Sequence, residues 1–192
     1  LENLHRVSDS KVQLVWPLPH ASLVYLPAAK KQHTAFAVLA AGGAYGAVCT
    51  MVEAMPVAAR LNALGFDCFC LNYRTAVPES FVSGLMPQPL DDLADALRLI
   101  AENRTVFDVD PMQYLLFGFS AGGHLAASLA TLYGSDATRP DFQILFYPVI
   151  SMLKGVTHSG SRQNLIGETP SAELEQKYSL ERQVSPKTPQ AF

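Results

Sequence analysis

Ser120 stands in the middle of a Gly-Phe-Ser-Ala-Gly sequence at residues 118–122. The apolar residues 114–117 have the length of a strand, and residues 121–132 are rich in Ala and Leu, which favours a helix. A serine on a sharp turn between a strand and a helix can act as a nucleophile. Such a turn has little room for side chains two positions to either side, and glycines occupy both positions. The helix would direct free N–H groups at the reacting oxygen, so we predict that Ser120 is a nucleophile.

Strands and helices are expected to alternate around this motif. Residues 35–41 are continuously apolar, as in a strand buried on both faces, and they run into a glycine-rich turn. The pattern is typical of an α/β fold with a mostly parallel sheet and helices on both faces. The expected strands are residues 12–16, 22–26, 35–41, 66–71, 114–117 and 142–147, and the expected helices are residues 54–64, 90–103, 121–132 and 171–178.

Length and composition narrow the range of functions. A chain of 192 residues suits one domain, residues 1–192. The net charge of −3 offers no basic face for nucleic acid, and no apolar run approaches the ~20 residues of a membrane span. No residues have the spacing of a metal site, so we expect no metal and no cofactor. Cys68 and Cys70 would share one face of a strand, which is poor disulfide geometry and favours free thiols in a reducing cytoplasm.

Several of these motifs together carry a family likeness. They are Gly-Gly-Ala-Tyr at residues 42–45, Leu-Asn-Tyr-Arg at 71–74, the serine motif with Gly-His-Leu at 118–125, and Tyr-Pro-Val-Ile at 147–150, with weaker support from Asn-Leu-Ile-Gly at 164–167 and from Ser-Pro at 185–186. The chain resembles α/β-hydrolases of the bacterial acetyl-esterase and carbohydrate-esterase type, related to the hormone-sensitive-lipase-like and xylan-esterase groups. This resemblance implies an α/β-hydrolase fold and hydrolysis of short acyl esters, often on sugars.

The chain departs from the family pattern at two places. Ala41 stands where many relatives have His or Pro. In such a fold the catalytic acid and then the histidine follow the serine, and only 72 residues follow Ser120. The resemblance implies that the strand bearing the acid begins near Phe192. We therefore expect the acid and the base beyond residue 192, a sheet that lacks its last strands, and a domain that is incomplete at its C-terminal end.

Three residues are candidates to replace the expected acid and base. His124 lies one helical turn after Ser120, where a packing role is favoured. His158 follows the C-terminal edge of the strand at 142–147 and could approach the site on a loop, although a surface role is favoured. Asp141 opens that strand, roughly 20 Å from the catalytic edge at ~3.3 Å per residue.

The donors of an oxyanion hole can be assigned by the geometry of the elbow. One donor is the N–H of the residue after the nucleophile, Ala121, and the other comes from the loop after the buried strand, at Gly43 or Ala44. An ordinary glycine-rich turn is the alternative for this loop.

Other side chains near these motifs have two interpretations. Tyr45 and Tyr73 could line an acyl or sugar pocket, or belong to the core. Arg74 is expected to anchor a loop through a carboxylate such as Asp92.

The sequence therefore predicts a serine esterase acting through Ser120 on a small-molecule ester, with no nucleic-acid or membrane partner. The alternatives are a hydrolase-fold binding module without turnover, and a peptidase or thioesterase on the same fold. An unpaired sheet edge would also favour association between copies of the chain.

Overall fold

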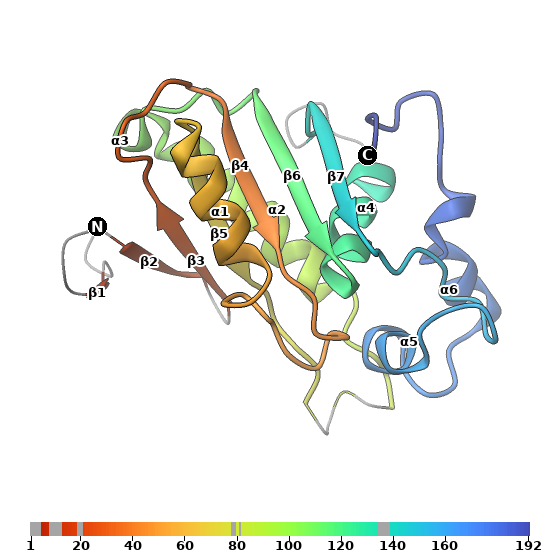
Figure 1. Cartoon of the computed structure of the whole chain (residues 1–192). Helices are drawn as coiled ribbons and strands as arrows, with labels where there is room; N and C mark the ends of the chain where they lie inside the picture. Colours follow the sequence, from red (N-terminus) through yellow and green to blue (C-terminus); the bar gives the residue numbers. More distant parts are fainter. Residues whose placement is uncertain (1–4, 8–12, 19–20, 78–79, 81, 134–138) are drawn as a thin grey trace.

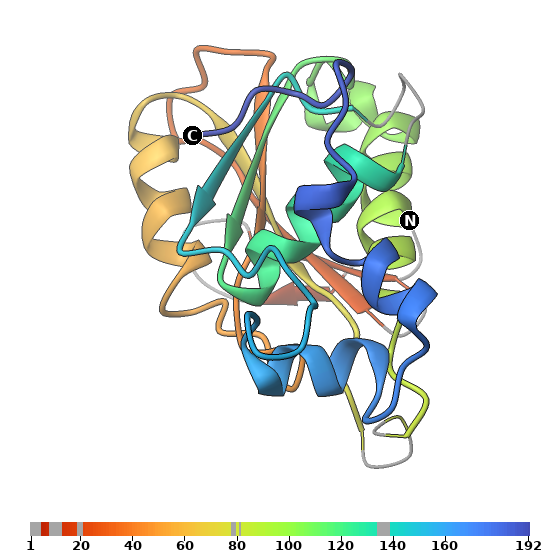
Figure 2. The ribbon, with the colours of Figure 1, turned by 90° about the vertical axis from the view of Figure 1, so that its right-hand side faces the viewer.

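Seven strands form one sheet with helices on both of its faces (Figures 1 and 2). The computed structural model describes all residues except 1–4, 8–12, 19–20, 78–79, 81 and 134–138. The strands are β1 (His5–Val7), β2 (Gln13–Leu18), β3 (Ala21–Leu26), β4 (Phe36–Ala40), β5 (Asp67–Asn72), β6 (Tyr114–Phe119) and β7 (Phe142–Phe146). The helices are α1 (Ala54–Ala63), α2 (Gln88–Glu102), α3 (Arg104–Phe107), α4 (Ala121–Leu132), α5 (Ser159–Ile166), α6 (Ala172–Lys177) and the 3₁₀ helix η3 (Leu180–Arg182).

The strand order is β1-β2-β3-β5-β4-β6-β7. The strands β5, β4, β6 and β7 are parallel to their neighbours, and β1 to β3 extend the sheet in antiparallel fashion. The predicted α/β-hydrolase fold is confirmed, including the pairing of the two early strands, although Val12 of the first predicted strand lies outside the described residues. Four elements were not predicted from the sequence: β1, the short helix α3, α5 and the 3₁₀ helix η3.

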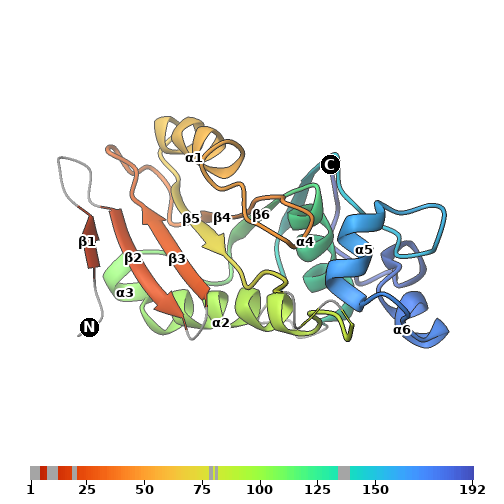
Figure 3. The same cartoon turned by 90° about the horizontal axis from the view of Figure 1, so that it is seen from below.

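The buried strand β4 shows why the sheet has two cores. Phe36, Val38 and Ala40 pack with α2 and α4 on one face, while Ala37 and Leu39 pack with α1 on the other. Successive side chains of a strand point to opposite faces, so a strand covered on both sides has to be apolar throughout. Figure 3 shows α1 and α2 on opposite sides of the sheet.

The C-terminal part of the chain lies at the β7 side of the sheet. α5 and α6 are at the opposite end of the molecule from β1, both in the view of Figure 1 and in that of Figure 3. The last residues then run parallel to β7. Gln143 N donates to Gln190 O at 3.0 Å and Leu145 N donates to Phe192 O at 2.8 Å, with an isolated parallel bridge between Gln143 and Ala191.

The cysteines of β5 are free, as the sequence indicates. Cys68 and Cys70 are fully buried against α1 and neither forms a disulfide. Burial raises the pKa of Cys70 to about 12, so this thiol stays protonated near neutral pH. None of the helices in the described residues is long and apolar enough to cross a membrane.

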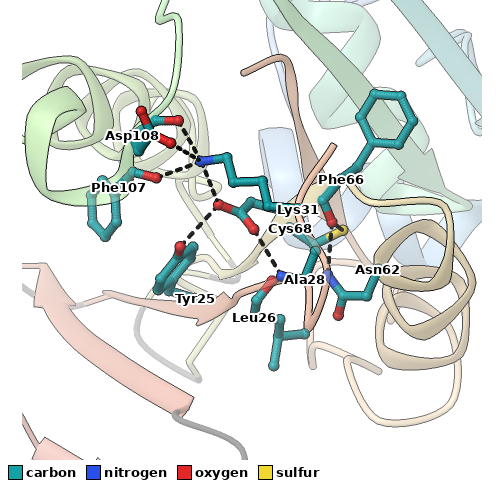
Figure 4. A network of polar contacts seen from close by, with 10 residues as sticks. Tyr25, Leu26, Ala28, Lys31, Asn62, Phe66, Cys68, Phe107 and Asp108 are labelled. Carbon is teal, nitrogen blue, oxygen red and sulfur yellow. Dashed lines mark hydrogen bonds and ion pairs between the residues drawn. The ribbon is translucent and has the colours of Figure 1, made fainter. Parts of the chain in front are cut away.

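A buried carboxylate joins the early loops to the start of β5. Asp67 is 1% exposed and accepts hydrogen bonds from Tyr25 Oη at 2.9 Å and from Ala28 N at 2.8 Å. Lys31 Nζ lies 3.0 Å from Oδ2 of Asp67, the oxygen that also accepts from Tyr25, and it donates to the carbonyls of Phe107, at 2.7 Å, and Asp108 (Figure 4). Burial, and then Asp67, raise the pKa of Tyr25, which keeps its hydroxyl a donor. A buried charge is tolerated only with such a full set of partners.

We expect Asp67→Ala to lower the free energy of unfolding by about 3 kcal/mol, because it leaves Lys31 without its buried counter-ion and two part-buried donors without their acceptor. Urea denaturation monitored by circular dichroism would measure this change. The control is Asp95→Ala, which breaks the exposed ion pair with Arg98 and should cost about 0–1 kcal/mol. Equal effects of the two substitutions would show that the buried network has no special role in stability.

Candidate active site

Ser120 lies on the turn between β6 and α4, as predicted. Its φ of 49° and ψ of −116° are unusual for a residue other than glycine. The turn is fixed by its backbone, because Ser120 N donates to Phe146 O at 3.0 Å while Ser120 O accepts from Val149 N at 3.0 Å and His124 N at 3.2 Å. Strain of this kind persists only where the surrounding structure determines the conformation, and it is common at functional sites.

The glycines of the motif allow α4 to pack closely against the sheet. A Cβ on Gly122 would lie 2.1 Å from the carbonyl oxygen of Ala40, and one on Gly118 would lie 2.6 Å from that of Gly122. Real Cβ atoms do not approach other atoms so closely. Both positions therefore require glycine, for the steric reason that the sequence indicates.

The glycine-rich loop after β4 lies directly beside the serine. A Cβ on Gly42 would be 2.9 Å from the Ser120 Cβ. Gly43, Ala44 and Tyr45 then follow with positive φ values of 132°, 54° and 59°. Two consecutive residues with a side chain in this region make the loop strained, so it needs other contacts to hold it.

The predicted donors of the oxyanion hole are the backbone N–H groups of Gly43, Ala44 and Ala121. None of the three donates a hydrogen bond within the part of the chain that the structure describes. Ala121 is the first residue of α4, where an N–H has no partner inside the helix. The assignment of these amides as an oxyanion hole stays a prediction.

Side chains from three other segments hold the glycine-rich loop. Tyr73 Oη donates to Ala41 O at 2.7 Å, and Glu53 Oε2 accepts from Gly42 N at 2.5 Å. Asn164 of α5 donates from Nδ2 to Ala44 O at 2.9 Å, across 120 positions of sequence. These contacts hold the backbone of the loop that lies beside Ser120. Sequence reasoning missed Glu53 entirely, and the only signal for Asn164 is that it opens the Asn-Leu-Ile-Gly segment of the family likeness.

Tyr45 and Tyr73, the two candidates for a substrate pocket, lie in the core. Tyr45 is fully buried and Tyr73 is 3% exposed, and neither lines the cavity beside Ser120. The hydroxyl of Tyr45 lies 2.9 Å from His124 Nδ1. Their described contacts fit the core alternative, because Tyr45 anchors its own loop to His124 and Tyr73 supports the loop through Ala41 O.

His124 is a fully buried neutral histidine, in line with the favoured packing role. Nε2 must carry the proton, because it lies 2.8 Å from the carbonyl oxygen of Tyr178, which can only accept. Nδ1 then accepts from Tyr45 Oη. Burial lowers the pKa of His124 to about 4, and the hydrogen bond to Tyr178 O offsets part of this effect. This ring joins the glycine-rich loop to the C-terminal segment.

Asp141 and Arg74 both lie where the sequence predicts them. Asp141 precedes β7 and donates from N to Tyr114 O, at the end of the sheet opposite Ser120. Arg74 Nη2 lies 2.8 Å from a carboxylate oxygen of Asp92, and Arg74 N also donates to that carboxylate. The anchoring role that the sequence favours for Arg74 is confirmed.

A cavity of about 580 Å³ opens at Ser120. Its lining consists of Ser120, residues 147–151 after β7, residues 156–158 before α5, and Glu181 of η3. A cavity of this size is in the range that holds a drug-sized ligand. Sequence reasoning weighed His158 but missed Glu181, which no local pattern marks.

His158 is in this lining as the N-cap of α5. Its Nδ1 accepts from Ser161 N at 3.2 Å and lies 3.0 Å from Ser161 Oγ. Within the described residues, Ser120 Oγ makes no hydrogen bond to a histidine or a carboxylate. No three His, Cys, Asp or Glu side chains of the described chain are grouped as metal ligands.

A parallel sheet with a serine elbow at the end of a central strand, and a glycine-rich loop beside it, defines an α/β-hydrolase. The family model BD-FAE matches residues 23–180. The chain belongs to this family, within the esterase-like α/β-hydrolases.

Named relatives agree with this membership. The chain is 35% identical over 161 residues to endo-1,4-beta-xylanase B of Butyrivibrio fibrisolvens, covering 79% of this chain, and 33% identical over 127 residues to an acetylxylan esterase of Xylanibacter ruminicola, covering 66%. It spans 25% of the length of each of these two proteins. The crystal structure of an acetyl ester-xyloside bifunctional hydrolase from Caldicellulosiruptor lactoaceticus superposes with a TM-score of 0.75 at 33% identity, covering 90% of this chain and 64% of that one.

The low pKa of His124 predicts how the free energy of unfolding depends on pH. In the unfolded chain the His124 ring is protonated near pH 6.5, and in the folded chain only near pH 4. The free energy of unfolding therefore has its full value above about pH 6.5 and falls as the pH is lowered towards 4. The loss amounts to about 3 kcal/mol. Chemical denaturation at a series of pH values should show this slope in the natural chain and a much shallower one in His124→Gln.

The control for this test is His33→Gln, which removes an exposed histidine that stacks on Phe66. It should keep the slope of the natural chain between pH 6.5 and 4. If His124→Gln kept that slope as well, the neutral buried state of His124 would be refuted.

Proposed function

We propose that the chain carries the nucleophile and the oxyanion hole of a serine carboxylesterase, with Ser120 forming the acyl-enzyme. The observation that supports this most directly is the strained elbow itself. Ser120 lines a cavity of about 580 Å³, and the backbone N–H groups of Gly43, Ala44 and Ala121 donate no hydrogen bond within the described residues, which supports the proposal.

In this mechanism Ser120 Oγ attacks the carbonyl carbon of the ester and its proton passes to a base. The N–H groups of Ala121 and of Gly43 or Ala44 stabilise the negative oxygen of the tetrahedral intermediate. The alcohol then leaves with a proton, and water cleaves the acyl-enzyme to release the acid and restore the serine. The family resemblance implies that the base and its orienting carboxylate lie beyond residue 192.

The substrate class that fits is a short-chain acyl ester, including acetylated carbohydrates. The acetylxylan esterase and the acetyl ester-xyloside hydrolase among the relatives support this class by their names. A cytoplasmic location, a small-molecule partner and association between copies stay predictions.

Ser120→Ala should lower the rate of 4-nitrophenyl acetate hydrolysis below that of the natural chain, because the acyl-enzyme can no longer form. Loss of a triad member leaves residual catalysis of about 10³–10⁴-fold over water, so weak activity of the chain would be consistent with the proposal. The assay follows 4-nitrophenolate release, with Ser83→Ala on an exposed loop as the control. Equal rates for Ser120→Ala and the natural chain would refute the nucleophile.

A second candidate is a binding module without turnover. It is favoured by one observation, that Ser120 Oγ has no histidine or carboxylate partner in the described residues. This candidate predicts ligand binding that survives Ser120→Ala and no covalent labelling by a serine-directed phosphonate. Peptidase or thioesterase chemistry would instead appear in a panel of amide and thioester substrates.

Asn164→Leu tests whether the glycine-rich loop is held for catalysis. The substitution removes the donor to Ala44 O, and we expect the Ser120-dependent rate to fall about 10-fold with little change in KM, less than the 10²–10³-fold for loss of an oxyanion donor itself. The chain offers a matched control in Asn103→Leu, because Asn103 also donates to a backbone carbonyl, that of Leu99, but away from the site. A similar loss of rate in both variants would show only general destabilisation.

A further inference from the structure

One ring nitrogen of His158, Nδ1, is occupied because it caps the first turn of α5. Nδ1 accepts the backbone N–H of Ser161 and therefore bears no proton in the neutral ring. The proton of the neutral ring is on Nε2, which has no partner among the described residues. His158 consequently offers the cavity an N–H donor, and its orientation is set by the start of α5.

Glu181 provides the complementary group in the same cavity. Its Oε1 accepts from Ser151 Oγ at 3.0 Å, and both residues belong to the lining. Oε2 makes no hydrogen bond to the described part of the chain. A donor on His158 and an acceptor on Glu181, whose Oε1 also lies 4.0 Å from Arg182 Nε, are therefore both in the lining of this cavity, which otherwise includes apolar side chains such as Val149, Ile150 and Val156.

Tyr147 adds an aromatic surface to this cavity. The residue is 64% exposed although its φ of 38° is strained, and its hydroxyl donates to Glu53 Oε1 at 3.0 Å. An exposed aromatic ring held in one place can pack against the apolar face of a ligand. Strained residues of this kind concentrate where ligands bind.

From this lining we infer that His158 and Glu181 are the residues that recognise hydroxyl groups on the alcohol part of the ester. A hydroxyl group both donates and accepts, so neighbouring hydroxyls can bind the imidazole N–H and the carboxylate at the same time. The ring of a sugar would also contact the apolar lining. The volume of about 580 Å³ exceeds what an acetyl group needs. The inference rests on the proposed function.

The test uses His158→Asn, because asparagine is also a strong N-cap and can accept the Ser161 N–H. α5 should therefore keep its start while the cavity loses the Nε2–H donor. Binding is measured on the Ser120→Ala form by NMR titration with methyl β-D-xylopyranoside, which has three hydroxyls, and with cyclohexanol, which has one. We expect the xyloside to bind more tightly than cyclohexanol. We also expect His158→Asn to lower the affinity for the xyloside by about 3- to 10-fold and to leave the affinity for cyclohexanol unchanged.

The matched control is Ser171→Asn, which exchanges the N-cap of α6, away from the cavity, and should change neither affinity. Glu181→Gln is the second variant, and it should also lower the affinity for the xyloside without changing the affinity for cyclohexanol. The inference is wrong if His158→Asn does not change the affinity for the xyloside, or if it lowers the affinities for both alcohols equally. It is also wrong if cyclohexanol binds as tightly as the xyloside.

Covalent labelling of the natural chain by a 4-nitrophenyl phosphonate separates this inference from the proposed function. Labelling at Ser120 without selective xyloside binding would overturn the inference and leave the esterase proposal standing. Selective xyloside binding without labelling would support recognition by His158 and Glu181 and remove the proposed nucleophile.

Discussion

The close contact between the first turn of α4 and the end of β4 is the constraint on which the site depends. The Gly122 backbone is so near the Ala40 carbonyl that no side chain fits between them. This contact places the start of the helix at the end of the central strands and forces Ser120 into a strained conformation. The serine hydroxyl and the free N–H of Ala121 then occur at the same edge, which is the arrangement that acyl transfer requires.

The second constraint is the neutral His124 ring, because it ties three parts of the molecule together. It lies on α4, accepts from Tyr45 of the glycine-rich loop, and donates to Tyr178 of the C-terminal segment. In a low-dielectric interior each of these bonds is strong and each missing partner would be costly. The strain of Ala44 and Tyr45 is thus offset by contacts with residues far away in the sequence.

The sequence predicted the parts of the fold that local rules determine. Alternation of apolar strands with amphipathic helices was sufficient for β4 to β7 and α1, α2 and α4, and the glycines around Ser120 were sufficient for the elbow. It did not predict α5, whose N-cap is a histidine, or the roles of Glu53 and Asn164, which act through tertiary hydrogen bonds. Tyr45 and Tyr73 stayed ambiguous because an aromatic residue after a strand has the same sequence pattern in a core and in a pocket.

His158 shows how one hydrogen bond can decide between two interpretations of a residue. Its position after β7 allowed an approach to the catalytic edge, although a surface role was favoured; the residue is exposed, and it also shares a cavity with Ser120. A general base would need a free acceptor nitrogen, yet capping α5 occupies Nδ1 and leaves the proton on Nε2. The same cap makes the ring a well-oriented donor. The elbow, encoded locally, would then perform the chemistry, while the segment that follows β7 would select the alcohol.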